Sequence, residues 1–138
     1  RYSAHHWSDL GGALREVHRV LKPGGRAAFV DIAGAPRPLL DTHLQTVEVL
    51  RDPSHVRDYT PAEWLQLVAQ AGLKPERHAL SRLRLEFASW VERMRTPEPL
   101  RIAIRALQDG ASREVRDYFA IEADGSFSAD VLVLWASR

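Results

Sequence analysis

Two adjacent histidines near the start of the chain, His5 and His6, are the residues best suited to moving a proton. A neutral imidazole accepts a proton near pH 7, which few other side chains can do. Ser3 and Ala4 precede the pair and Trp7 follows it. In one interpretation, one histidine contacts a cofactor or substrate and acts as a base. In the other, one ring packs under the following helix and the other hydrogen-bonds the backbone.

A second set of reactive side chains lies in the polar stretch from residue 51 to residue 59. It contains Arg51, His55 and Arg57, and Pro53 interrupts it. Because a guanidinium binds a carboxylate through two parallel hydrogen bonds, this stretch could anchor an acidic substrate or close over a pocket. The alternative is a loop held by Arg–Asp contacts, with Pro53 and Ser54 forming a turn.

Asp31 occurs in the nearly continuous apolar run Arg26–Ile32, which follows the turn Lys22–Gly25. A short apolar run between turn residues is typical of a strand buried on both faces, and it favours a parallel sheet between helices. Asp31 could then make a polar contact to a ligand. Its other interpretation is a partner for a helix cap or a loop.

The pattern around this strand predicts an α/β fold. Apolar spacing predicts a helix from Ser8 or Asp9 to about Leu21 and another over residues 39–50. Residues 60–63 form a capping box that opens a helix ending at Ala71. Ligands of open α/β sheets bind at the carboxyl ends of the strands. We therefore expect the segments 3–7, 31–36 and 51–59 to converge there.

The rest of the chain is predicted as a half-buried strand over residues 81–87, extending back towards Glu76, and then three short helices. These helices cover residues 88–94, 100–108 and 112–117. Asp124-Gly125 is a strong signal for a two-residue turn, so residues 118–122 and 127–136 are predicted to form a terminal antiparallel hairpin.

Composition excludes several classes of function. The net charge of +1 gives no basis for binding nucleic acid. The chain has no cysteine, which excludes disulfides and thiolate metal sites. No apolar run reaches the ~18 residues of a membrane span. The histidines lack the i, i+4 spacing and carboxylate partner of a zinc enzyme, so we predict no metal site.

Two motifs carry a resemblance to a known family. The first is the segment Ser3–Trp7 followed by a helix that ends in Arg19–Gly25, which reads RVLKPGG. The second is Glu48–Gly72, which contains LRDPSHVRDY and then EW. In this order they resemble class I S-adenosylmethionine-dependent methyltransferases, in the bacterial branch near the ubiquinone/menaquinone C-methyltransferases. The resemblance covers about residues 1–90.

The resemblance implies the C-terminal part of a Rossmann-like methyltransferase sheet, with flanking helices and the terminal antiparallel hairpin. The Gly-rich cofactor motif of this family has no counterpart here, since the chain contains no Gly-x-Gly. Residues 1–138 are therefore expected to form a single partial domain that starts at the carboxyl end of strand four. We expect the N-terminal cofactor-binding half to be missing from it and the chain alone to be inactive.

The resemblance also implies roles for the candidate residues. The expected catalytic residues are His5 and His6, and the expected contacts to S-adenosylmethionine are Ser3, Ala4 and His5. The expected substrate-binding residues are Trp7, Asp31, Arg51, His55 and Arg57. The expected partners are a small-molecule methyl acceptor and a second copy, or another association, that covers the exposed sheet edge. We expect a cytoplasmic enzyme. The alternative is a non-catalytic binding or dimerisation module derived from a methyltransferase.

Overall fold

The structure, a computed structural model, describes all 138 residues and divides by its internal contacts into two compact units. The first unit comprises Arg1–Gly34, Val56–Ser81 and Asp130–Arg138, and the second comprises Ala35–His55 and Arg82–Ala129. The α/β fold class is confirmed. None of the helices combines the length and the apolar character that a membrane span requires.

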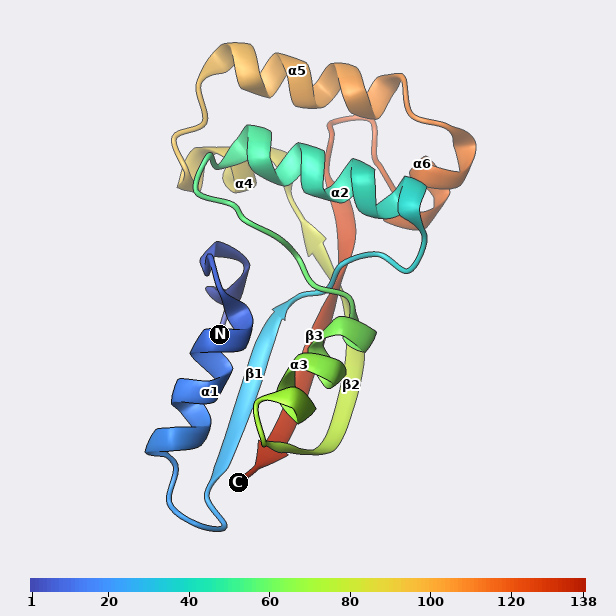
Figure 1. Cartoon of the computed structure of the whole chain (residues 1–138). Coiled ribbons are helices and arrows are strands. Elements are labelled where there is room, and N and C mark those ends of the chain that lie inside the picture. Colours follow the sequence, from blue (N-terminus) through green and yellow to red (C-terminus); the bar gives the residue numbers. More distant parts are fainter. The chain divides into compact units, whose positions relative to one another are not determined.

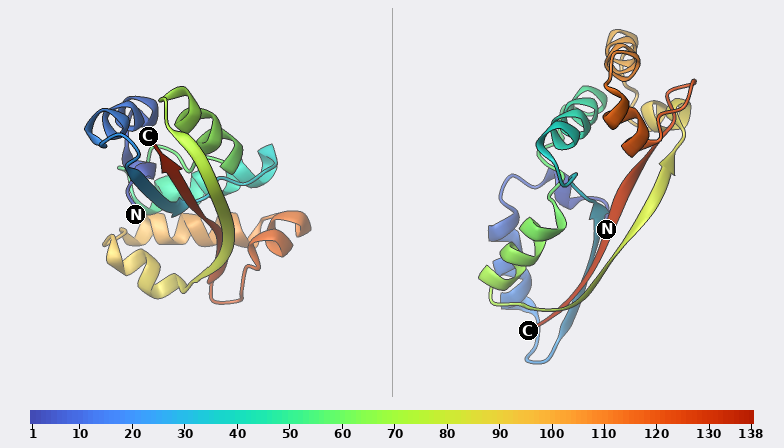
Figure 2. Two further views of the ribbon diagram at one scale, coloured as in Figure 1. Left: turned by 90° about the horizontal axis from the view of Figure 1, so that it is seen from below. Right: turned by 90° about the vertical axis from the view of Figure 1, so that its right-hand side faces the viewer.

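The first unit is a sheet covered on one face by two helices. In chain order its elements are the 3-10 turn η1 (Ala4–His6), α1 (Leu10–Val20), β1 (Arg26–Ile32) and α3 (Pro61–Gln70), with the larger parts of β2 (Lys74–Leu85) and β3 (Phe127–Ser137). The helices α1 and α3 contact each other, and the views agree that both lie on the same side of the strands (Figures 1 and 2).

The strand order is β1-β3-β2, so the last strand in the sequence is the central strand of the sheet. β3 runs antiparallel to β1, with Arg26 opposite Ser137 and Ile32 opposite Val131. The arrowheads of β2 and β3 also point in opposite directions (Figure 1). The predicted strand Arg26–Ile32 is confirmed with the same bounds, but its neighbour in this chain is antiparallel rather than parallel.

The core of the first unit explains why these segments fold together. Leu10 and Leu14 of α1 and Trp64 of α3 are at most 1% exposed, and they pack with Leu132 and Leu134 of β3. These residues lie at helical spacing in the helices and at alternate positions in the strand, so each element presents one apolar face. The hydrophobic effect therefore places both helices on the same face of the sheet.

The two outer strands are less buried than their sequences predict. Arg26 and Ala28 of β1 are exposed, and only the last two residues, Asp31 and Ile32, are buried. The prediction of a strand buried on both faces is thus wrong for most of β1, because α1 and α3 cover one face only. β2 is exposed along nearly its whole length rather than half-buried, because it forms the other edge of the sheet.

The terminal hairpin is the main error in the predicted secondary structure. The turn at Asp124-Gly125 exists, and Ser126 N–H donates to Asp124 Oδ1 over 2.9 Å. However, Tyr118 belongs to a helix, α6 (Arg113–Phe119), which ends at Ala120 in the left-handed conformation. The turn therefore joins a helix to β3, and β3 pairs with β1 instead of with residues 118–122.

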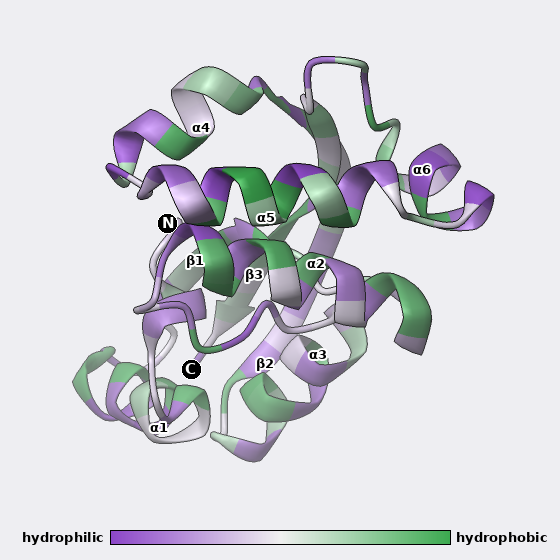
Figure 3. Ribbon diagram, turned by 90° about the horizontal axis from the view of Figure 1, so that it is seen from above, coloured by the Kyte–Doolittle hydropathy of each residue, from purple (hydrophilic) through white to green (hydrophobic).

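The second unit contains four helices. Their bounds are α2 (Pro38–Arg51), α4 (Phe87–Arg93), α5 (Glu98–Asp109) and α6. Apolar and polar residues alternate around α5 (Figure 3), which buries Ile104 and Gln108 and exposes Ile102. The α2 and α5 helices contact each other, and Trp90 of α4 packs edge-on against Phe127 with their ring centroids 5.0 Å apart.

The capping box at the start of α3 is confirmed. Glu63 N–H donates to Thr60 Oγ1 over 3.2 Å, and Thr60 N–H donates to Glu63 Oε2 over 2.8 Å. Burial raises the pKa of Glu63, but hydrogen bonds from Thr60 and the nearby charge of Arg57 outweigh it and lower the pKa below its ordinary value. The carboxylate thus contributes its full stabilisation at neutral pH and loses it as the pH falls through the lowered pKa.

We expect Thr60→Ala to lower the free energy of unfolding by about 1 kcal/mol, the usual value of an N-cap side chain. Urea unfolding followed by circular dichroism measures the change. Thr60→Ser keeps the hydroxyl and is the matched control, which should lose only a small fraction of that amount. Equal losses in the two variants would contradict a capping role for the hydroxyl.

Candidate functional site

The carboxyl end of β1 carries a buried carboxylate, Asp31, that binds the opening segment of the chain. Its Oδ2 accepts hydrogen bonds from the backbone N–H groups of Ala4 at 2.7 Å and Ser3 at 3.1 Å. Its Oδ1 lies 2.6 Å from His5 Nδ1 and accepts from Ile32 N–H at 3.0 Å. With a side chain only 3% exposed, Asp31 is surrounded by N–H donors rather than by solvent.

Local backbone geometry delivers these donors to Asp31. The segment curls into η1 because Trp7 N–H donates to the Ala4 carbonyl at 3.0 Å. Two residues before η1, Tyr2 N–H donates to the Val30 carbonyl at 2.8 Å. This hydrogen bond attaches the opening segment to the outer edge of β1. The amides of residues 3 and 4 therefore point at the Asp31 carboxylate.

His5 is held from two sides. Its ring lies against Asp31, and its carbonyl accepts hydrogen bonds from the backbone N–H groups of Val56 at 2.8 Å and Arg57 at 3.1 Å. The side chain is 13% exposed, and the ring centroid of His6 lies 4.1 Å from that of His5. The structure thus brings the segments 3–7 and 56–58 to the carboxyl end of β1.

A third titratable group, Asp58, joins His5 and Asp31, and sequence reasoning did not single it out. It is 1% exposed, and ligand atoms of the three residues lie within 4.8 Å of one another. Such a set can in principle hold a cation. Because the Asp31 carboxylate already accepts from three backbone N–H groups and lies against His5 Nδ1, this set is described better as a hydrogen-bonded cluster. A buried polar residue inside a polar loop leaves no pattern in the sequence.

A groove of about 350 Å³ lies along β1 beside this cluster. Four predicted site residues line it: Ser3, Ala4, Trp7 and Asp31. Its other walls are Arg1, Val17, Ala27, Ala28, Phe29, Val30 and Trp64. The groove is mostly apolar, with its polar groups at the carboxyl end of the strand.

Arg57 belongs to the same unit, but its side chain turns to α3. Its guanidinium lies 3.1 Å from Glu63 Oε1 and 5.8 Å from the ring centroid of Tyr59. The alternative interpretation of this loop expected an Arg–Asp contact, and the observed acidic partner is Glu63. The Arg57 side chain is 36% exposed.

Arg51 and His55 belong to the second unit, and not to the unit that holds Asp31 and His5. The Arg51 guanidinium donates to the Trp90 carbonyl at 2.9 Å and lies 3.4 Å from Glu48 Oε2. Burial lowers the pKa of Arg51, while Glu48 opposes that shift. His55 Nε2 lies 2.8 Å from Gln45 Oε1. The predicted turn at residues 53 and 54 is confirmed, since Asp52 Oδ1 accepts from Ser54 N–H at 2.9 Å.

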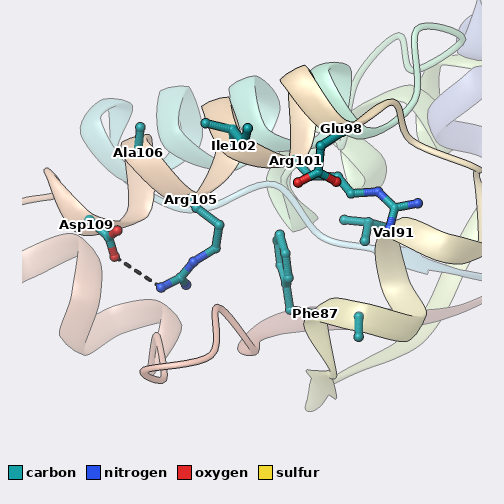
Figure 4. Close-up of a pocket in the computed structure, with 9 residues that line it drawn as sticks. Phe87, Val91, Glu98, Arg101, Ile102, Arg105, Ala106 and Asp109 are labelled. Carbon is teal, nitrogen blue, oxygen red and sulfur yellow. Dashed lines mark hydrogen bonds and ion pairs between the residues drawn. The ribbon is translucent and has the colours of Figure 1, made fainter.

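A larger groove, of about 490 Å³, lies in the second unit between α4 and α5 (Figure 4). The aromatic ring of Phe87 faces α5 there, and two guanidiniums are nearby. Both are paired: Arg101 lies 3.0 Å from Glu92 Oε2, and Arg105 lies 3.2 Å from Asp109 Oδ1. None of the predicted site residues lines this groove.

The residues of the opening segment fit a methyl donor only in part. The amides of Ser3 and Ala4 already donate to Asp31, and their carbonyls accept from His6 and Trp7 within η1. What remains for a cofactor is the Ser3 hydroxyl and the apolar wall of the groove. A sulfonium cofactor with a carboxylate and a ribose needs more polar partners than these residues supply.

The sequence and the fold are both similar to those of methyltransferases. A model described as a methyltransferase domain matches residues 1–29. The uncharacterized protein YafE of Escherichia coli (strain K12) is 54% identical over the whole chain, which spans 67% of that protein. The uncharacterized methyltransferase YcgJ of Bacillus subtilis (strain 168) is 39% identical over 121 residues, which are 88% of this chain and 48% of YcgJ.

Two solved structures share the fold along the chain. The structure of YcgJ superimposes with a TM-score of 0.93 at 34% identity, over all of this chain and 61% of that one. A proposed methyltransferase from Bacillus halodurans C-125 gives a TM-score of 0.94 at 26% identity, over 99% of this chain and 61% of that one. The chain therefore spans about half to two thirds of the proteins that it matches.

The finer assignment to the quinone C-methyltransferase branch stays a prediction. The broader resemblance is confirmed, because the matched domain model, the similarity to YcgJ and the fold of both solved structures agree. The chain belongs to the class I S-adenosylmethionine-dependent methyltransferases.

Proposed function

We propose that residues 1–138 form the substrate-side part of an enzyme that transfers a methyl group from S-adenosylmethionine to a small molecule. In this proposal the cofactor is held mainly by residues that precede Arg1 in a longer protein. The observation that carries the proposal is the cluster of His5, Asp31 and Asp58 at the carboxyl end of β1, in a chain whose opening residues match a methyltransferase domain.

Each predicted site residue has a role in this proposal. His5 and His6 lie at the reacting end, and one of them takes the proton that the acceptor loses. Ser3 and Ala4 contact the cofactor along the groove, and Trp7 forms part of its wall. For Arg57, whose side chain is partly exposed, we propose contact with the acceptor, and Arg51 and His55 stay proposed as further substrate residues. When bound, the sulfonium cofactor supplies an activated methyl group.

We expect the 138-residue chain to bind S-adenosylmethionine at least about 100-fold more weakly than the longer protein, whose KM should fall in the usual enzyme range of about 1 μM–1 mM. The reason is that the amides of Ser3 and Ala4 already donate to Asp31 and leave few polar groups for the cofactor. Isothermal titration calorimetry of both proteins with the same cofactor stock measures the difference. Micromolar binding by the short chain would show that these residues hold the cofactor themselves.

A second candidate function is a binding or dimerisation module without catalysis. It is favoured by the position of β1 at the edge of the sheet, next to an apolar groove, because such an edge can pair with another chain. Size-exclusion chromatography with light scattering should then show a dimer of the 138-residue chain, and a monomer at high concentration would contradict it. Methyl transfer by the longer protein would instead favour the first candidate function, an enzyme for which we propose a cytoplasmic location.

A further inference from the structure

We propose that Asp31 is a positioning residue that fixes His5 as the tautomer protonated at Nδ1, so that Nε2 is the nitrogen that takes a proton from the methyl acceptor. This inference rests on the proposed function. It reassigns Asp31, which the sequence suggested as a contact to substrate. It also names the substrate class: acceptors whose reacting atom carries a hydrogen that must leave.

The contacts of Asp31 determine which nitrogen of His5 carries the proton. A carboxylate only accepts hydrogen bonds, so the 2.6 Å contact between Asp31 Oδ1 and His5 Nδ1 requires the proton to sit on Nδ1. The other three contacts of Asp31 come from backbone N–H groups of Ser3, Ala4 and Ile32. These donors occupy the acceptor positions of both carboxylate oxygens and hold the group in place. The carboxylate therefore has little capacity left to bind a substrate.

The orientation of the His5 ring is fixed by contacts from two elements. His5 is fixed through Nδ1 by β1, and through its own carbonyl by Val56 and Arg57. With its backbone and its Nδ1 both fixed, the ring has a defined orientation, and the imidazolium that forms is stabilised by the carboxylate at Nδ1. Asp58 and His6 are the other titratable groups beside this ring, and a ligand atom of Asp58 lies within 4.8 Å of those of His5 and Asp31.

The reaction that follows balances its atoms and electrons. An acceptor X–H supplies the electron pair that forms the X–CH3 bond. The bond from the methyl carbon to sulfur breaks, and its pair goes to sulfur, which turns the sulfonium into a neutral thioether. The proton leaves X for His5 Nε2, and the imidazolium later returns it to water. A hydroxyl or an acidic C–H needs such a base, whereas a tertiary amine or a thioether does not.

The first test reads the tautomer directly and needs no activity. The full-length protein is labelled with 15N-histidine, and long-range 1H–15N spectra of the neutral rings are recorded with and without Asp31→Asn. His5→Gln assigns the signals. We expect His5 to be protonated at Nδ1 in the wild type and at Nε2 in Asp31→Asn, because an amide can place its NH2 group against Nδ1. Asp9→Asn removes the same charge at an exposed helix cap and is the matched control, with no change expected.

The second test measures kcat for an O–H or acidic C–H acceptor. We expect Asp31→Asn and His5→Gln each to lower kcat by about 10²–10⁴-fold, the usual contribution of a positioned base. If Asp31 acts through His5, the double variant loses little beyond His5→Gln alone, since coupled residues are not additive. Circular dichroism melting curves check that the variants fold.

The outcomes separate the inference from the proposed function. Unchanged His5 tautomer in Asp31→Asn, or losses that multiply in the double variant, would overturn the positioning role. A shift of the wild-type His5 signals by equimolar Zn²⁺ or Mg²⁺ would also overturn it, in favour of a cation site. If the full-length protein transfers no methyl group to any acceptor, the proposed function fails, while the spectra still decide how Asp31 and His5 are paired.

Discussion

Replacing Gly34 with alanine is expected to destabilise the first unit by about 3 kcal/mol, the upper end of the usual range for overpacking. The new Cβ would lie 2.5 Å from the Asp58 carbonyl oxygen and 2.9 Å from the Thr60 nitrogen. These obstacles are backbone atoms, which cannot rotate away as a side chain can. The hydrogen bond from Gly34 N–H to the Tyr59 carbonyl, now 3.0 Å, would break as the loop moves.

Urea unfolding measures the loss of stability, and the NMR signals of His5 report whether the loop around Asp58 has moved. Gly11→Ala is the matched control. A Cβ at Gly11 meets its nearest neighbour at 3.4 Å, which is ordinary contact, and alanine favours a helix by up to about 1 kcal/mol over glycine. The two substitutions should therefore change stability in opposite directions. Equal effects would show that Gly34 is not at a close approach of two backbones.

Replacing Trp64 with alanine is expected to cost about 3–5 kcal/mol, the usual loss when a large core aromatic is truncated. Trp64 is 1% exposed and lies between Phe29, at 5.5 Å between ring centroids, and Tyr59, at 6.5 Å. Its removal leaves a cavity between α3 and the sheet. Since a small domain is stable by only about 5–15 kcal/mol, the variant should unfold at a much lower urea concentration.

Trp64→Phe is the control for the size of the cavity. The indole Nε1 is buried and has no hydrogen-bond partner. Because a buried donor without a partner costs about 1–3 kcal/mol, its removal offsets part of the lost packing. We expect Trp64→Phe to lose clearly less than Trp64→Ala, because a phenyl ring still fills most of the space that the indole occupies. A loss as large as that of Trp64→Ala would contradict the view that the size of the cavity sets the cost of the substitution.

Local signals in the sequence predict most elements of this fold. The capping box at Thr60 marks the start of α3, because its two hydrogen bonds form between residues three apart. The strand Arg26–Ile32 has its predicted bounds, since turn residues flank a short apolar run. The helix from Leu10 to Val20 follows its Asp9 cap, whose side chain accepts from Gly12 N–H.

The errors arise where distant residues decide the structure. The turn at Asp124-Gly125 is a strong local signal, but the segment before it has its own helix cap at Ser112. β3 then pairs with a strand far away in the sequence, which no local pattern can show. In the same way, the exposure of β2 follows from its place at the sheet edge rather than from its alternating sequence.

The candidate site was predictable in its residue types but not in its contacts. His5 and Asp31 were singled out by their chemistry and by the rule that sites lie at the carboxyl ends of strands. The contacts of the Asp31 carboxylate with Ser3, Ala4 and His5 form only because η1 turns these residues towards it. The segment that carries Asp58 packs closely against Gly34, where an added Cβ would lie 2.5 Å from the Asp58 carbonyl oxygen, and this contact between distant residues leaves no local pattern.

The order in which the strands are synthesised restricts when this protein can fold. β1 and β2 are not neighbours in the sheet, and each pairs with β3, which is synthesised after both of them. While a ribosome is still translating, these two strands have unpaired edges, and contacts between residues distant in the chain form slowly. Nascent chains in which Phe127–Ser137 has not yet emerged from the ribosome should therefore be targets for chaperones and proteases, and those in which it has emerged should resist both.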